Sequence, residues 1–188
     1  MAWLINSLSA PSPSLAPQPA PAQPVSAMAS SRVRIGELTA RVNEGWIREA
    51  PSSSMRLTQF RLPSIEGVVD DAELAVFSSI GGSIQDNLNR WFGQFSQPDG
   101  SDSQEKARVQ EFSVDGMSAT IADLTGTFTG GGMPMSQPVE KKNYRLLAAI
   151  VVGVSDVYYF KLVGPEKTVE RWATSFGEFI GNLRALTQ

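Results

Sequence analysis

The chain has 188 residues, a length that suits one domain, and its net charge of −3 argues against a dedicated nucleic-acid binder. It contains neither histidine nor cysteine. This composition excludes catalytic triads built on His or Cys, Cys/His zinc sites, thiol redox chemistry and histidine-ligated haem. We therefore expect no cofactor, no metal and no nucleic-acid partner.

The first 31 residues form a tail without a charged side chain, and six of the 12 prolines lie in it. Proline fixes φ and lacks an N–H group, so this segment cannot join a helix or the interior of a sheet. It also has few large apolar residues, so burial would not offset the entropy lost on ordering. We expect a disordered Ala/Pro/Ser-rich tail over residues 1–31 and a single α+β domain over residues 32–188.

The tail does not determine the cellular compartment. Residues Met1–Ile5 are too short for the apolar core of a signal peptide and lack its basic flank. They suit the remnant of an export signal that starts upstream, and equally an ordinary terminus. An upstream signal would direct the protein to the periplasm, the cell envelope or the exterior, and otherwise it would be cytoplasmic. No apolar run approaches the ~18 residues of a membrane span, so we expect no transmembrane segment.

Short apolar runs between turn residues predict strands in the first half of the domain. These strands cover the segment from Val33 to the turn at Asn43–Trp46, then Met55–Phe60 and Ala72–Phe77. The last of them is apolar on both faces, as a buried strand is. A turn and helix N-cap follow at Gly81–Ser83. Helical spacing then predicts a core-facing stripe made of Ile84, Leu88, Trp91, Phe92 and Phe95.

The second half predicts two hairpins and a final helix. Residues 109–114 and 118–128 flank Asp115-Gly116, a strong hairpin signal, and residues 144–154 and 157–163 form the second pair. Pro165 stands at the favoured first position of a helix. Its expected core face consists of Val169, Trp172, Phe176, Phe179 or Ile180, and Leu183. Together the elements predict an α+β fold, a largely antiparallel β-sheet flanked by two helices.

Three segments carry a resemblance to a known family: Asn43–Trp46, Arg90–Phe92, and the strand Tyr158–Gly164 running into Pro165. In this order, across residues 33–186, they resemble the PsbP/Mog-like α/β/α sandwich. The resemblance extends to uncharacterised bacterial envelope proteins and lipoproteins that carry the domain behind an Ala/Pro-rich tail. Family members serve as extrinsic subunits of photosynthetic complexes or as partners of the GTPase Ran, but none of those functional residues can be placed here. The lipobox cysteine of a lipoprotein is absent, which leaves membrane anchoring open.

Several motifs have a simpler structural explanation than a functional one. The stretch Gly126–Gly132 lacks the Lys-Ser/Thr ending of a phosphate-binding loop, so it predicts a flexible connection between strands. The acidic run Asp99–Glu105 lacks the full calcium-loop pattern, and we expect solvated turn residues there. Glu111, Asp115 and Asp123 lie on neighbouring predicted strands and could act as a carboxylate pair, but their spacing alone does not bring them together.

Three residues are candidates for recognition: Trp46, Met133 and Met135. The two methionines are adaptable contact residues in the Gly-rich loop of residues 131–138. Trp46 lies in a turn after a strand, where it is either an exposed aromatic anchor or a plug for the end of the core. The second interpretation is favoured because burying an aromatic ring contributes a large apolar area.

The sequence as a whole predicts a non-enzymatic binding or assembly module, envelope-associated or exported, with a protein partner. One alternative is a hydrolase with an unrecognised carboxylate or Ser/Lys site, which would require a concave pocket with convergent groups. A further alternative is a cytosolic regulatory protein, as the Ran-binding branch of the family implies. No pattern in the sequence indicates an oligomeric state.

Overall fold

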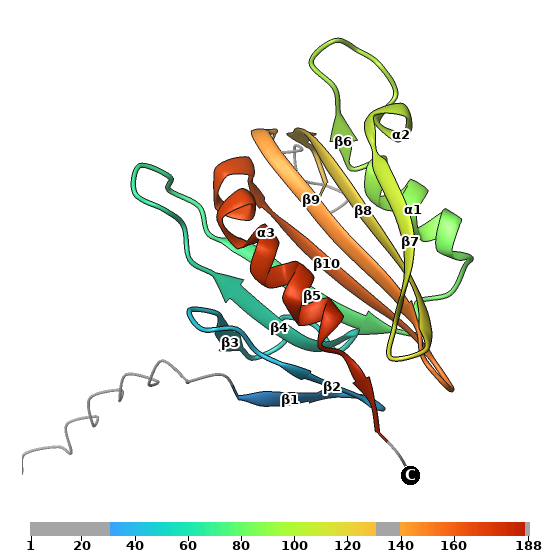
Figure 1. Cartoon of the computed structure of the whole chain (residues 1–188). Coiled ribbons are helices and arrows are strands. Elements are labelled where there is room, and N and C mark those ends of the chain that lie inside the picture. Colours follow the sequence, from blue (N-terminus) through green and yellow to red (C-terminus); the bar gives the residue numbers. More distant parts are fainter. Residues whose placement is uncertain (1–30, 131–139, 187–188) are drawn as a thin grey trace, which may run out of the picture.

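The computed structural model describes residues 31–130 and 140–186, and an eight-stranded antiparallel sheet forms its centre (Figure 1). The strand order is β3-β4-β5-β10-β9-β8-β6, and β7 also pairs with β8. β10 and β9 are therefore central strands. The bounds are β3 Ile47–Glu49, β4 Arg56–Leu62, β5 Ala72–Ser78, β6 Phe95–Ser96, β7 Arg108–Val114, β8 Met117–Phe128, β9 Lys141–Val152 and β10 Val157–Pro165.

One helix packs against each face of this sheet, as the sequence predicted. Helix α3 (Glu166–Gly181) lies across the face that looks towards the viewer in Figure 1, and α1 (Ile84–Phe92) packs on the other. A small second sheet, β1-β2-β11, lies beside α3; its strands are Arg32–Ile35, Leu38–Arg41 and Arg184–Ala185. One turn of helix, α2 (Ser103–Lys106), precedes β7. No helix within the described ranges is long and apolar enough to cross a membrane.

The larger core lies under α3, and aromatic rings fill its centre. Phe179 of α3 is fully buried, and its ring centroid lies 5.0 Å from Trp46, 6.0 Å from Phe60 and 6.1 Å from Phe160. These partners come from the β2–β3 turn, β4 and β10. Phe179 therefore joins three segments that are distant in the sequence.

The smaller core lies under α1 and covers only part of the opposite face. Its buried members in the described chain come from α1, β6, β8, β9 and β10, and none of them comes from β3, β4 or β5. Helix α1 begins at a capping box in which the Ser83 hydroxyl accepts the Asp86 N–H and the Asp86 carboxylate accepts the Ser83 N–H. Helix α1 has only nine residues, and of the strands β3–β5 only β5 reaches this core, through the partly buried Phe77.

The prediction of one strand from Val33 to the turn at Asn43–Trp46 is wrong, because the segment folds into the hairpin β1–β2. Gly36 makes the turn with φ +59°, a conformation that glycine adopts without strain. The turn is fixed to the β9–β10 hairpin: the Glu37 N–H donates to the Tyr158 hydroxyl at 3.0 Å, and the Glu37 carboxylate accepts the Ser155 N–H at 2.8 Å.

Other differences concern the ends of elements. Pro165 is the last residue of β10 and the N-cap of α3, so it does not begin the helix as predicted. Phe95 belongs to β6 rather than to the α1 stripe. Strands β3, β6 and β11 have two or three residues each, too short for alternation to be recognised in the sequence.

Replacing Phe179 with alanine should test the larger core. We expect Phe179→Ala to lower the free energy of unfolding by about 3–5 kcal/mol, because it removes a ring that contacts three others and leaves a cavity. Thr174→Ala on the exposed side of the same helix is the control, with an expected change within about 0.5 kcal/mol. Urea unfolding followed by fluorescence measures both. Equal effects of the two variants would contradict this description of the core.

Candidate functional site

A cavity of about 410 Å³ opens on the half of the sheet face that α1 leaves uncovered. Residues of β5 and β10 line its floor, and Gln94, Phe128 and Tyr144 line the side towards α1 and β8. Its volume is in the range of small-molecule sites. The lining combines aromatic rings with charged groups, so the pairing of those charges determines what the cavity can do.

Lys161 lies on the cavity floor because side chains along β10 alternate between the two faces of the sheet. Tyr158, Phe160 and Leu162 pack into the core under α3, so the alternate residues, Lys161 among them, face the other way. In the sheet register, Lys161 lies opposite Ala75 on β5 and Ala148 on β9. Both neighbours have the small side chain of alanine, which leaves space above the central strands for a long side chain.

The Lys161 ammonium is enclosed on the α1 side. It donates a hydrogen bond to the Gln94 side-chain oxygen at 2.5 Å and lies 6.0 Å from the ring centroids of both Trp91 and Phe128. Within residues 31–130 and 140–186, no carboxylate forms an ion pair with it. Lys161 therefore has no direct ion-pair partner among the described residues.

This environment lowers the pKa of Lys161 from its ordinary value of 10.5 to about 8. Burial of the ammonium contributes most, the positive charge of Arg56 adds to it, and the negative charge of Glu73 acts in the opposite direction. A group with this pKa is still mostly protonated at pH 7. Lys161 therefore presents a cation to the cavity at neutral pH rather than a general base.

Two other charged residues of the lining, Arg56 and Glu73, form an ion pair with each other. An Arg56 guanidinium nitrogen lies 2.8 Å from a Glu73 carboxylate oxygen and donates to the Gln59 side-chain oxygen at 2.6 Å. The guanidinium carbon also lies 5.9 Å from the Phe77 ring centroid. The positive charge of Arg56 is thus already paired, and its orientation is fixed from two strands.

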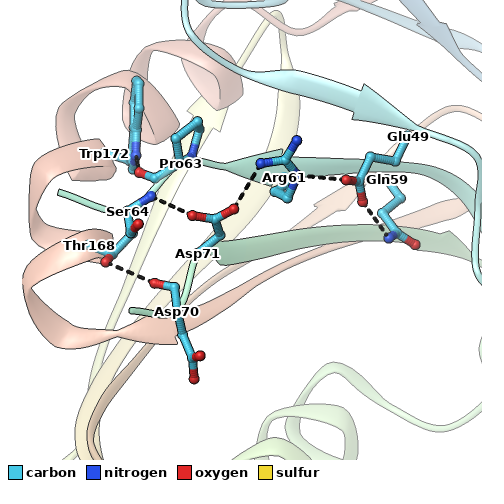
Figure 2. A network of polar contacts seen from close by, with 9 residues as sticks. All are labelled: Glu49, Gln59, Arg61, Pro63, Ser64, Asp70, Asp71, Thr168 and Trp172. Atoms are coloured by element: carbon cyan, nitrogen blue, oxygen red, sulfur yellow. Dashed lines mark hydrogen bonds and ion pairs between the residues drawn. The ribbon is translucent and has the colours of Figure 1, made fainter. Parts of the chain in front are cut away.

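A polar network extends from the cavity across β4 to β3, and Figure 2 shows it from close by. The Asp71 carboxylate accepts hydrogen bonds from Arg61 at 2.8 Å and from the Ser64 N–H at 2.7 Å. Both bonds lower the pKa of Asp71, and the bond from Arg61 has the larger effect. Arg61 also donates to Glu49 at 2.8 Å. Asp71 is therefore an ionised residue of the cavity wall whose two carboxylate oxygens already accept hydrogen bonds.

The same network fixes the segment before β5 to α3 from the other side. The Trp172 indole N–H donates to the Pro63 carbonyl at 2.8 Å, and the Thr168 hydroxyl donates to the Asp70 carbonyl (Figure 2). The Asp70 carboxylate accepts hydrogen bonds from the Tyr144 hydroxyl and, at 3.0 Å, from the Lys141 ammonium. Both bonds lower the pKa of Asp70, and the bond from Tyr144 has the larger effect. Lys141 at the rim is consequently paired.

Every charged residue of the cavity lining except one has an ion-pair partner within the described chain. Its lining contains the cations Arg56, Lys141 and Lys161 and the anions Asp71 and Glu73. Asp71 is paired with Arg61, Arg56 with Glu73, and Lys141 with Asp70. Lys161 remains the one unpaired charge among the lining residues that the structure describes.

Of the recognition candidates from the sequence, the described one, Trp46, does not line this cavity. Trp46 is 7% exposed, its ring packs on Phe60 and Phe179, and its N–H donates to the Ser175 hydroxyl at 3.2 Å. It is a core residue and presents no aromatic surface for recognition. Met133 and Met135 lie outside the described residues.

The three carboxylates named as a possible catalytic group are dispersed. Asp123 on β8 pairs with Arg145 at 2.8 Å and with Arg108, whereas Asp115 lies in the β7–β8 turn and accepts the Ala185 N–H at 3.0 Å. Glu111 lies opposite Thr120, three positions along the strand from Asp123. The structure therefore brings no two of them together.

Lys161 was not singled out from the sequence, although a signal exists. It is the one charged residue in the apolar strand of residues 157–163, and it shares parity with Tyr159 and Val163 rather than with solvent-facing residues. A lysine between apolar neighbours on a strand predicted to be buried is the pattern that could have indicated the site.

Comparison with known proteins identifies the fold class. No family model and no curated protein matches the chain. Among solved structures, cyanobacterial PsbP (CyanoP) from Synechocystis sp. PCC 6803 is similar at 15% identity and a TM-score of 0.52, covering 89% of this chain and 99% of its own. PA94, a protein of unknown function from Pseudomonas aeruginosa, is similar at 11% identity and a TM-score of 0.48, covering 85% and 99%. The chain has a PsbP-like α+β fold.

Replacing Lys161 with methionine should stabilise the fold at pH 7. The variant keeps the apolar stem and removes a partly buried charge, so we expect the free energy of unfolding to rise by about 1–2 kcal/mol. Lys161 binds its proton less tightly in the folded chain than in the unfolded one. Wild-type stability therefore increases as the pH rises from about 8 towards 10.5, and the advantage of the variant shrinks over that range.

Urea unfolding between pH 6.5 and 10 measures this effect. Lys167→Met, at an exposed position of α3, is the matched control and should change stability by less than about 0.5 kcal/mol at every pH. A loss of stability in Lys161→Met at pH 7 would show that the ammonium stabilises the fold, and would contradict the account of the site given above.

Proposed function

We propose that this chain is a non-enzymatic binding domain and that the cavity beside Lys161 is its binding site for a small molecule. The observation that supports the proposal is the unpaired ammonium of Lys161, which faces a cavity although an apolar residue would be more stable there. Residues that lower stability at a concave surface are typical of functional sites. The proposal includes a location in the envelope or outside the cell, which the uncharged tail of residues 1–31 supports.

The hydrolase alternative fits the cavity less well. The described lining contains neither serine nor threonine, so it offers no Ser/Lys pair. Its two carboxylates, Asp71 and Glu73, are each engaged in an ion pair with an arginine, so neither is free for acid–base chemistry on a substrate. Lys161 is a cation at neutral pH. These groups can hold a ligand, but they do not form an acid–base pair.

A protein partner, which the sequence suggested, is the second candidate. The loop that would provide the methionine contacts, with Met133 and Met135, lies outside the described residues. The cavity itself has the dimensions of a small-molecule site rather than the extent of a protein interface. We therefore place the proposed binding event at the cavity.

A binding screen by two-dimensional NMR tests this proposal. The probes are a panel of monocarboxylates, amines, amides and phosphate esters built on the same small aromatic and aliphatic bodies. We expect at least one of them to shift the backbone amides of β5 and β10 that flank the cavity, and to remain chemically unchanged over a day of incubation. If none shifts these amides, or if a bound compound is consumed, the proposal is wrong.

A variant that fills the cavity provides the matched test. Ala75 is buried beside Lys161 on the cavity floor, and Ala75→Leu should weaken the binding of any probe found by at least tenfold by occupying the space. Ala50→Leu adds the same side chain at an exposed position outside the lining and should leave binding unchanged. Thermal unfolding of both variants verifies that they are folded.

A further inference from the structure

We propose that the ligand of this cavity is a small organic monoanion whose carboxylate pairs with Lys161 and whose apolar or aromatic body lies against Phe77 and Phe128. The inference rests on the function proposed above and adds the chemical class of the ligand. It depends on three properties of the site: the ion pairs among its charged residues, the N–H donors of Lys161 that remain available, and the apolar part of the lining.

The pattern of ion pairs around the cavity favours one negative charge on the ligand. The other two cations of the lining, Arg56 and Lys141, already have carboxylate partners at 2.8 and 3.0 Å. Lys161 alone has none among the described residues, so a monoanion would supply the ion-pair partner that Lys161 lacks. A dianion such as a phosphate monoester would introduce a second negative charge near Asp71 and Glu73, which line the same cavity.

The available donors also favour a carboxylate. An ammonium group has three N–H donors, and Gln94 accepts one of those of Lys161. The two that remain suit the two oxygens of one carboxylate. Phosphate sites, by contrast, commonly use the planar fork of an arginine, and the Arg56 fork is held by Glu73 and Gln59.

The aromatic lining specifies the rest of the ligand. Phe77 from β5 and Phe128 from β8 line the cavity, with Val163 and Ala75 on its floor. The Phe128 ring is held by Tyr144, stacked at 6.0 Å, and by Phe95 at 5.2 Å, so this wall is preformed. Such surfaces bind flat or branched apolar groups. They also exclude water from the ammonium, which strengthens its attraction to an anion.

The volume limits the size of this body. A cavity of about 410 Å³ is near the lower end of the range for small-molecule sites, so a single ring or a short branched chain fits it better than a long acyl chain. Phenyl-substituted short acids have this combination of one ring and one carboxylate. They serve as probes of the class, without any claim that one of them is the natural ligand.

Four probes with one common body separate the possibilities. They are 3-phenylpropionate, 3-phenylpropionamide, 3-phenylpropylamine and 3-phenylpropyl phosphate, each titrated into the full chain at pH 7 with NMR shifts of β5 and β10 as the readout. We expect the carboxylate to bind at least tenfold more tightly than the amide, and the amine and the phosphate to bind more weakly than the carboxylate. Lys161→Met should reduce the preference for the carboxylate over the amide to less than threefold, whereas Lys167→Met should retain it.

The outcomes distinguish this inference from the function on which it rests. If the amide or the amine binds as tightly as the carboxylate, the carboxylate assignment is wrong while the cavity remains a binding site. Tighter binding of the phosphate overturns the monoanion in the same way, and so does a preference that survives in Lys161→Met. If neither these four compounds nor the wider panel shifts β5 and β10, the proposed function itself fails. The comparison of the acid with the amide on the wild-type protein tests the carboxylate assignment even if the Lys161 variant does not fold.

Discussion

A partly desolvated ammonium group on a central strand is the constraint around which this site is arranged. Burial disfavours the charged form of Lys161, and the nearby positive charge of Arg56 adds to the effect. The sheet tolerates the group because the residues opposite it, Ala75 and Ala148, are small and because Gln94 accepts one of its hydrogen bonds. A fold selected for stability alone would place an apolar side chain there.

The rest of the architecture determines that this charge faces a cavity rather than a packed core. The face under α3 is closed by a long helix and a cluster of aromatic rings around Phe179, which makes it a rigid support. The opposite face is covered by the nine residues of α1 only over one half of the sheet. Within the open half, the polar network through Asp71 and Arg61 holds the wall in place (Figure 2). Stability and recognition are thus assigned to opposite faces of one sheet.

The sequence predicted the parts of this fold that local pattern determines. The long hairpins at Asp115-Gly116 and before Val157, and the aromatic stripe of α1, follow from alternation, turn residues and helical spacing. The site could not be predicted in the same way. Whether Lys161 is buried depends on the pairing of β10 with β5, about 80 positions earlier, and periodicity within one segment does not contain that information. The sequence favours the burial of Trp46 because of its large apolar area, but the element that covers its turn, α3, lies more than a hundred residues later and could not be predicted from the local pattern.

The central claim is that Lys161 is a partly desolvated cation beside an open cavity and that no carboxylate of the described chain forms an ion pair with it. The most direct measurement is an NMR titration of the protein labelled at the lysine ε-carbon, with the Lys161 signal assigned by its absence in Lys161→Met. The account predicts a pKa near 8 for Lys161 in the free protein. A pKa above 10 would contradict it, because such a value would mean that the ammonium is either fully hydrated or paired with an acidic group.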